Sequence, residues 1–223
     1  MEDRGTLVIF DLDGTLLNTI ADLGTACNYA LRQCGLPEHA LTDYPGFVGN
    51  GINKLIERAI GAEHSAIGVE QVKPSFLDYY NAHCCDLTQP YEGIMALLQT
   101  LKRQGVTLAL ASNKYQQATE TIIRHFFPGI FDIVEGEREG RPRKPNPQIV
   151  QDIMQQLTFP LRKGATLYVG DSVVDIETAH NAGLQVAACT WGFATREALK
   201  TALPDWLVDV PQEILAVLTE KQK

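Results

Sequence analysis

The chain has 223 residues, of which 45% are hydrophobic and 21% are charged, the proportions of a globular protein that can bury a full core. This composition argues against a disordered or a membrane chain. The 19 Lys+Arg and 27 Asp+Glu residues give a net charge of -8, which argues against a nucleic-acid backbone as the main partner.

The chain opens on a charged segment, and the apolar run that follows, residues 7–10, is too short for a signal peptide or a membrane span. The five cysteines form no CxxC pair, and an odd number without a secretory context indicates reduced thiols. We therefore expect a cytoplasmic protein with no membrane partner.

The first predicted strand covers residues 6–10, and further strands follow only after a long helical region. The later predicted strands cover residues 106–112, 131–136, 165–171 and 184–192. The helices predicted around them cover residues 94–105, 115–127, 147–157 and 173–183. Because these strands are apolar almost throughout, both faces of their sheet should be covered. The pattern therefore predicts an α/β fold with a Rossmann-like, doubly wound parallel sheet.

One region interrupts the alternation of strands and helices. It holds three helical patterns and no convincing strand, over residues 20–35, 51–60 and 69–85. A crossover between parallel strands needs only about a dozen residues, so this region is too long to be one. We expect an inserted α-helical cap domain over residues 16–88, with residues 1–15 and 89–223 forming the core.

Polar side chains follow the strands at the edge where a doubly wound sheet binds its ligands. Those after the first strand are Asp11, Asp13 and Thr15, and those after the second are Ser112 and Asn113. Further along come Lys144 in a loop and Asp171, Ser172 and Asp175 after the fourth strand. The sequence thus predicts carboxylates, hydroxyls and an ammonium at a single edge.

Asp11 and Asp13 are one residue apart, so their like charges repel unless something holds them. With Asp171 they supply only oxygen donors, with no cysteine or histidine beside them. Such a set suits a hard octahedral cation, which predicts Mg²⁺.

A phosphate group would complete the shell of that cation. Ser112, Lys144 and the backbone N–H groups around Gly14 would bind it from the other side. Asp11 would attack phosphorus and form an aspartyl-phosphate. Asp13 would protonate the departing alkoxide and later accept a proton from water.

Four segments in this order resemble the motifs of haloacid dehalogenase superfamily phosphatases. They are "DLDGT" at 11–15, "SN" at 112–113, "KP" at 144–145 and "GDSVVD" at 170–175. The resemblance spans nearly the whole chain and keeps the order and spacing of the family. Dehalogenases of this superfamily lack an acid equivalent to Asp13 and need no Mg²⁺, so its presence favours phosphoryl transfer.

The resemblance also implies a role for each residue of the motifs. Asp11 is implied to be the nucleophile, and Asp13 the acid/base and a Mg²⁺ ligand through its backbone carbonyl. Phosphate and substrate contacts are implied or expected for Ser112, Lys144, Thr15 and Asn113. Asp171 is implied to bind the metal directly and Asp175 to support the metal site from behind.

The segment 47–60, "FVGNGINKLIERAI", resembles the cap stretch of phosphoglycolate phosphatases. A flexible turn there would feed a helix N-terminus, whose free N–H groups attract anions. The turn residues, expected to bind substrate, are Gly49, Asn50 and Gly51. Lys54 and Arg58 share one face of the helix and either contact a substrate carboxylate or form a cationic stripe in solvent.

Other basic residues allow more than one interpretation. Arg138, Arg141 and Arg143 either steer an anion toward Lys144 or belong to a charged solvent loop. Lys114 follows the serine and asparagine of the second motif, with a weaker case than Asn113 for a role at the site.

Together these features predict a Mg²⁺-dependent phosphatase acting on a small phosphomonoester, with 2-phosphoglycolate as the leading substrate and a monomer or homodimer as the assembly. A broad sugar-phosphate or nucleotide phosphatase, a pyrophosphatase and a phosphomutase are the alternatives within the superfamily. The alternative from another class is a signalling module that receives phosphate on Asp11. Asp13 argues against that alternative, because a built-in acid/base speeds loss of the phosphoryl group.

Overall fold

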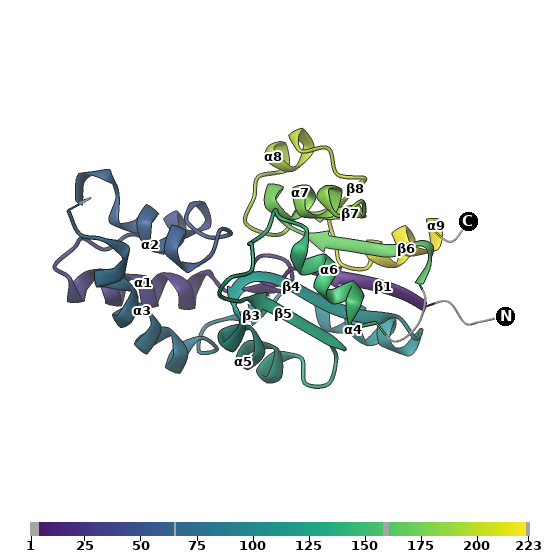
Figure 1. Cartoon of the computed structure of the whole chain (residues 1–223), viewed down its shortest axis with the longest axis horizontal. Coiled ribbons are helices and arrows are strands. Elements are labelled where there is room, and N and C mark those ends of the chain that lie inside the picture. The colour runs from purple at the N-terminus through teal and green to yellow at the C-terminus, as the bar shows by residue number, and fades with distance from the viewer. Residues whose placement is uncertain (1–4, 65, 158–160, 222–223) are drawn as a thin grey trace. The chain divides into compact units, whose positions relative to one another are not determined.

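The computed structural model describes residues 5–64, 66–157 and 161–221. The chain divides into two compact units (Figure 1). Met1–Leu17 and Pro90–Lys223 form the core unit, and Asn18–Gln89 form the helical unit. That the helical unit acts as a cap stays a prediction.

The core unit contains β1 (Gly5–Phe10), α4 (Ile94–Arg103), β4 (Thr107–Tyr115), α5 (Gln116–Phe126), β5 (Ile133–Glu137), α6 (Gln148–Gln155), β6 (Leu161–Gly170), α7 (Val173–Asn181), β7 (Gln185–Cys189), α8 (Arg196–Thr201), β8 (Trp206–Val208) and α9 (Glu213–Glu220). The helical unit contains α1 (Ile20–Gln33), the 3₁₀ turns η1 (Leu41–Gly46) and η2 (Ala62–His64), α2 (Ile52–Ile60) and α3 (Val69–His83). A separate two-stranded sheet consists of β2 (Leu17–Asn18) and β3 (Gln89–Pro90). These short strands lie where the chain passes between the units.

Within the described residues, six strands form one parallel sheet in the order β5-β4-β1-β6-β7-β8. β4 and then β5 follow β1 on one side of the sheet, and β6, β7 and β8 follow it on the other side. The strand order therefore reverses beside β1. Phe10 at the end of β1 pairs with Leu110 of β4 and with Val169 of β6. This register places the carboxyl ends of three strands at one edge, which is where such sheets bind ligands.

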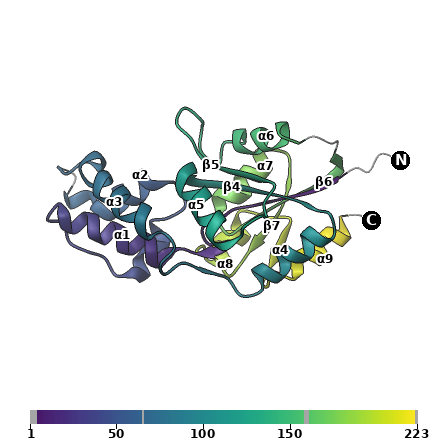
Figure 2. The ribbon, with the colours of Figure 1, turned by 90° about the horizontal axis from the view of Figure 1, so that it is seen from below.

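Alternate residues of the strands point to opposite faces of the sheet, and helices cover both faces. Leu7, Ile9 and Tyr168 join a buried apolar cluster with Ile153 of α6 and Ile176 of α7. On the opposite face, α4 and α9 lie side by side (Figure 2). Burial on both faces explains why the strands are apolar almost throughout, and the predicted doubly wound α/β fold is confirmed.

In the helical unit, α1 and α2 both pack against α3, and the three predicted helices are all present. Tyr29 of α1 stacks on Tyr79 of α3 with ring centroids 4.7 Å apart. Asp22 in the first turn of α1 accepts hydrogen bonds from the N–H groups of Leu87 and Thr88, at 2.9 Å and 2.8 Å. This buried carboxylate therefore ties the end of the helical unit to its beginning.

Elements absent from the sequence-based prediction are mainly short or lie near the C-terminus. They are α8, β8 and α9 after residue 192 and the two-residue strands β2 and β3. Strands of two or three residues contain too few positions to show a periodicity. In the described part of the chain, every helix is too short or too polar to cross a membrane.

Candidate active site

Asp11 stands at the carboxyl end of β1, and the sheet brings two further carboxylates to it. The Asp11 N–H donates to the carbonyl of Val169 at 2.9 Å, one step beyond the end of β1. Asp171 directly follows β6, and Asp175 lies in the first turn of α7. One oxygen of each carboxylate lies within 4.8 Å of the others, and all three residues are buried. Oxygen donors at this spacing are the kind of set that binds a hard divalent cation.

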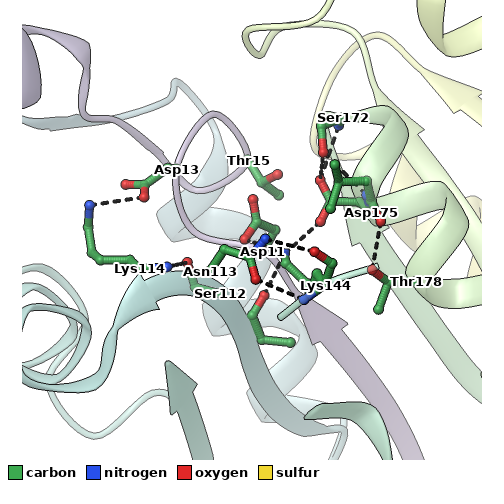
Figure 3. A network of polar contacts seen from close by, with 12 residues as sticks. Asp11, Asp13, Thr15, Ser112, Asn113, Lys114, Lys144, Ser172, Asp175 and Thr178 are labelled. Atoms are coloured by element: carbon green, nitrogen blue, oxygen red, sulfur yellow. Dashed lines mark hydrogen bonds and ion pairs between the residues drawn. The ribbon is translucent and has the colours of Figure 1, made fainter. Parts of the chain in front are cut away.

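Lys144 supplies positive charge to this cluster. Its Nζ donates to Asp11 Oδ1 at 2.8 Å and to Asp175 Oδ1 at 2.7 Å (Figure 3). It also donates to the carbonyl of Ala111 at 2.9 Å, and the Tyr168 hydroxyl lies 3.2 Å from the same Nζ. Burial lowers the pKa of this ammonium, but Asp11 and Asp175 more than offset it and hold the pKa well above its usual value. Lys144 is therefore a fixed, charged contact of Asp11.

The carboxylates of the cluster are hard to ionise together. Burial raises the pKa of Asp11 to about 7, with a further rise from Asp175 and a partial offset from Lys144. Burial also raises the pKa of Asp171 well above its usual value, and Asp175 and Asp11 add to the rise. The cluster thus holds three buried carboxylates. The ammonium of Lys144 forms ion pairs with two of them, Asp11 and Asp175. A divalent cation would relieve this repulsion, so the donor set fits such an ion.

Two loops hold Asp171 in place. Thr15 Oγ1 donates to its Oδ1 at 3.0 Å, and the N–H of Phe193 donates to its Oδ2 at 2.7 Å. A Cβ at Gly14 or at Gly192 would overlap the Asp171 side chain, so the close approach requires glycine at both positions. Thr15, which the sequence predicted to bind substrate, here orients a carboxylate of the cluster.

Asp175 has a second task at the start of α7. Ser172 is the N-cap of this helix, and its Oγ accepts from the Asp175 N–H at 3.2 Å. In return, Asp175 Oδ2 accepts from the N–H and the hydroxyl of Ser172, at 3.1 Å and 2.6 Å. This reciprocal capping leaves Oδ1 of Asp175 to Lys144 and fixes the carboxylate against the cluster.

Asp13 points away from the carboxylate cluster. Its Oδ2 forms an ion pair with Lys114 Nζ at 2.9 Å, and Figure 3 shows the carboxylate turned toward that lysine rather than toward Asp11. The two acids of the first motif are therefore held apart by two different lysines, Lys114 and Lys144. Sequence reasoning gave Lys114 little weight, although its place at the end of an apolar strand was a signal that it is buried.

Ser112 and Asn113 lie at the end of β4, and both are buried. Ser112 Oγ accepts from the N–H of Lys114 at 3.2 Å, which leaves the hydroxyl proton of Ser112 able to donate to a ligand. The Asn113 amide accepts from the Lys144 N–H at 2.9 Å and donates to the Lys144 carbonyl at 3.2 Å. Asn113, predicted to bind phosphate, thus clasps the backbone of the lysine that contacts Asp11.

The three arginines before Lys144 form ion pairs with carboxylates of the core unit. The Arg141 side chain is 10% exposed and forms ion pairs with Glu135 at 2.6 Å and with Asp152 at 3.0 Å. Arg138 also pairs with Glu135, at 3.2 Å, and Arg143 pairs with a second glutamate of β5. All three arginines are thus paired with carboxylates rather than left as unpaired steering charges, although Arg138 is half exposed. The partners lie only 3 to 11 residues apart in the chain. Sequence reasoning missed the network because the pairing depends on how the segment after β5 folds back, which no periodicity shows.

In the helical unit, the turn before α2 has the predicted form. Gly49 and Gly51 both have positive φ, 108° and 81°, and Gly51 is the N-cap of α2. Arg58 donates to Asn50 Oδ1 at 2.7 Å and to a backbone carbonyl of the same turn at 2.9 Å. Lys54 pairs at 2.7 Å with a glutamate three residues further on, in an exposed position. Arg58 thus stabilises the turn, and the substrate role of these residues stays a prediction.

Comparisons with known proteins agree with this arrangement. The model of the haloacid dehalogenase-like hydrolase family matches residues 8–189, which include every motif at the edge of the sheet. The chain belongs to the haloacid dehalogenase-like hydrolases. The predicted family resemblance and the prediction of an enzyme of the hydrolase class are confirmed.

Relatives of this haloacid dehalogenase-like hydrolase include several bacterial enzymes. It is 31% identical over 226 residues to phosphoglycolate phosphatase of Haemophilus influenzae (strain 86-028NP), covering 98% of this chain and 100% of that one. It is 35% identical over 190 residues to phosphoglycolate phosphatase of Cereibacter sphaeroides (strain ATCC 17025 / ATH 2.4.3), covering 83% and 85%. A crystal structure from Lactobacillus delbrueckii subsp. bulgaricus, provisionally described as a phosphoglycolate phosphatase, superposes with a TM-score of 0.87 at 32% identity, covering 98% and 99%.

Proposed function

We propose that this hydrolase is a Mg²⁺-dependent phosphatase that hydrolyses small phosphomonoesters through an aspartyl-phosphate, with 2-phosphoglycolate as its substrate. The observation that carries the chemistry is the buried Asp11 carboxylate, bonded to Lys144 and clustered with Asp171 and Asp175. The choice of substrate is supported by the relatives, two of which are named phosphoglycolate phosphatase and match across most of their length.

In the first half-reaction, an oxygen of Asp11 attacks the phosphorus atom and forms an acyl-phosphate bond. The bond between phosphorus and the ester oxygen breaks, and Asp13 gives a proton to the departing alkoxide. Lys144 and the hydroxyl of Ser112 bind the phosphoryl oxygens and offset their charge. The product alcohol leaves, and the phosphoryl group stays on Asp11.

In the second half-reaction, Asp13 takes a proton from a water molecule that attacks the same phosphorus atom. The acyl-phosphate bond breaks, which releases inorganic phosphate and restores the Asp11 carboxylate. Lys144 keeps its contact with Asp11. The same acid/base residue thus serves both halves, which makes the reaction a hydrolysis rather than a lasting modification.

Asp11 and Asp171 would hold the Mg²⁺ ion directly, with the backbone carbonyl of Asp13, and Asp175 would support them. When bound, the ion supplies positive charge that stabilises the phosphoryl oxygens. The three-carboxylate cluster and the raised pKa of Asp11 support this assignment. We also propose that the helical unit is the cap that selects the leaving group.

A panel of phosphate esters tests the proposal. Release of inorganic phosphate is measured from 2-phosphoglycolate, pyrophosphate, hexose phosphates and nucleoside monophosphates, each with Mg²⁺ and with EDTA. We expect 2-phosphoglycolate to give the highest kcat/KM and EDTA to abolish it. A preference for another ester would keep the phosphatase assignment and replace the substrate.

The same panel separates the other reaction classes. A phosphomutase would yield isomers of the sugar phosphate with little free phosphate, and a pyrophosphatase would act on pyrophosphate alone. A signalling module would give a long-lived phosphorylated protein without turnover of any ester. Any of these three results would overturn the proposed function.

A further inference from the structure

The ion pair between Lys114 and Asp13 has no assigned role in the proposed mechanism. The Lys114 side chain is 3% exposed, the Asp13 side chain is 13% exposed, and Nζ lies 2.9 Å from Oδ2. Lysine is seldom fully buried, because its flexible stem normally carries the ammonium to water. An ammonium buried against one carboxylate of the active site therefore points to a function at that carboxylate.

The backbone of Lys114 is fixed on both sides. Its N–H donates to Ser112 Oγ at 3.2 Å, and its carbonyl accepts from Thr119 Oγ1 at 3.1 Å. Gly136 of the neighbouring strand lies so close that a Cβ there would come within 2.7 Å of the same carbonyl oxygen. The side chain of Lys114 thus extends from a rigid base toward Asp13.

The two oxygens of Asp13 have different surroundings. Oδ2 faces the ammonium of Lys114, whereas Oδ1 is buried and has no hydrogen-bond partner among the described residues. A buried carboxylate oxygen without a partner is costly in a resting protein, so such an atom indicates a ligand that is not present. Figure 3 shows the carboxylate held clear of Asp11 by this arrangement.

We propose that Lys114 is a positioning residue, which holds Oδ2 of Asp13 so that Oδ1 stays available to exchange a proton with the leaving oxygen. The proposal rests on the acid/base role of Asp13 in the proposed function. Without the ammonium, the buried carboxylate loses its fixed orientation, and proton transfer to an alkoxide slows. Departure of a phenolate with a strongly acidic parent phenol needs no proton and is not affected.

The kinetic test compares two esters in Lys114→Met. kcat/KM reports the first half-reaction, in which the leaving group departs. We expect kcat/KM to fall at least about 10-fold on 2-phosphoglycolate and less than about 3-fold on p-nitrophenyl phosphate, since general acid catalysis typically contributes 10²–10⁴-fold. Lys114→Arg keeps the charge and should recover most of the loss. Lys102→Met, which removes a surface ion pair with Asp132, is the matched control and should change neither rate.

Equal losses on the two esters, or no loss on either, would refute the positioning role while leaving the phosphatase assignment intact. A wild-type protein that hydrolyses neither these two esters nor any other ester of the panel would refute the proposed function, and the structural test then decides the inference separately. In a crystal structure of Lys114→Met, we expect the Asp13 carboxylate to leave its wild-type orientation, and an unchanged orientation would overturn the proposal. If the methionine variant does not fold, Lys114→Gln takes its place in both tests.

Discussion

Asp11 and Asp13 are separated by a single residue, yet each has its own lysine. Lys144 holds Asp11 within the carboxylate cluster, and Lys114 turns Asp13 away from it. The sequence suggested that a shared cation relieves the repulsion between the two acids. In the structure, these separate ion pairs already reduce that repulsion. The sequence predicted the chemical types at this edge correctly, but the direction of each side chain depends on lysines far away in the chain.

Asp11→Asn tests the nucleophile. An amide cannot attack phosphorus to form an acyl phosphate, so we expect turnover to fall at least about 1,000-fold. The fold should persist, because the substitution removes a carboxylate whose pKa is raised by burial and by Asp175. Phosphate release and thermal unfolding are measured in parallel, with the exposed Asp209→Asn as the control. Near-normal turnover in Asp11→Asn would contradict the assignment.

The segment between β5 and α6 delivers Lys144 to the site and is held by a network of ion pairs around the buried Glu135. Arg141 joins Glu135 of β5 to Asp152 of α6 and lies three residues before Lys144. Without Arg141, the buried Glu135 would keep, among the described residues, only the half-exposed Arg138 as an ionic partner, and a buried carboxylate with a weakened ion pair costs stability.

Arg141→Met should therefore lower the free energy of unfolding by about 2 kcal/mol, the usual scale for losing hydrogen bonds to a charged group in a largely buried position. Arg138→Met is the matched control, because Arg138 pairs with the same glutamate but its side chain is 51% exposed. For the control we expect a change of about 0–1 kcal/mol. Urea denaturation of both variants gives the two values, and equal values would contradict the buried network.

The helical unit has a comparable tie at Asp22. Asp22→Asn replaces one accepting oxygen by an amide that cannot accept, while the N–H groups of Leu87 and Thr88 both need an acceptor. We expect a loss of about 1–2 kcal/mol. Hydrogen exchange at these two amides should become faster, whereas the exposed Asp78→Asn should leave it unchanged. Unchanged exchange in Asp22→Asn would show that the tie does not hold this segment.

Strands and helices with clear periodicity were predictable from the sequence, and ties between distant elements were not. β1, β4, β6 and α7 follow directly from apolar runs and their polar ends. β8 contains three residues, and its pairing with β7 depends on the tertiary fold. The clasp of Asn113 on Lys144 and the pair of Lys114 with Asp13 depend on how loops meet, which local patterns do not encode.

The chain carries a net charge of -8, and among the described residues three of its carboxylates are buried together in the cluster of Asp11, Asp171 and Asp175. A ligand that binds only the folded state stabilises it by mass action. Mg²⁺ bound among Asp11, Asp171 and Asp175 would both add this stabilisation and remove repulsion.

Mg²⁺ at about 100 times its dissociation constant should stabilise the fold by about 2.7 kcal/mol, and EDTA should reverse the effect. The midpoint of thermal unfolding is measured with MgCl₂ and with NaCl at equal ionic strength. Asp171→Asn should lose the Mg²⁺-dependent part of the shift. A midpoint shift of the same size with NaCl would show an effect of ionic strength alone. A Mg²⁺-dependent shift of the same size in Asp171→Asn would place the ion away from Asp171.

The order of strands in the sheet also affects how the protein is made. β1 lies between β4 and β6, both of which follow the helical unit in the chain. During synthesis, therefore, the ribosome completes the helical unit while β1 still has neither neighbour, and the apolar β1 must wait until residue 170 has emerged. Until then β1 has at most one of its two neighbouring strands, so its apolar side chains lack part of the cover that the finished sheet provides.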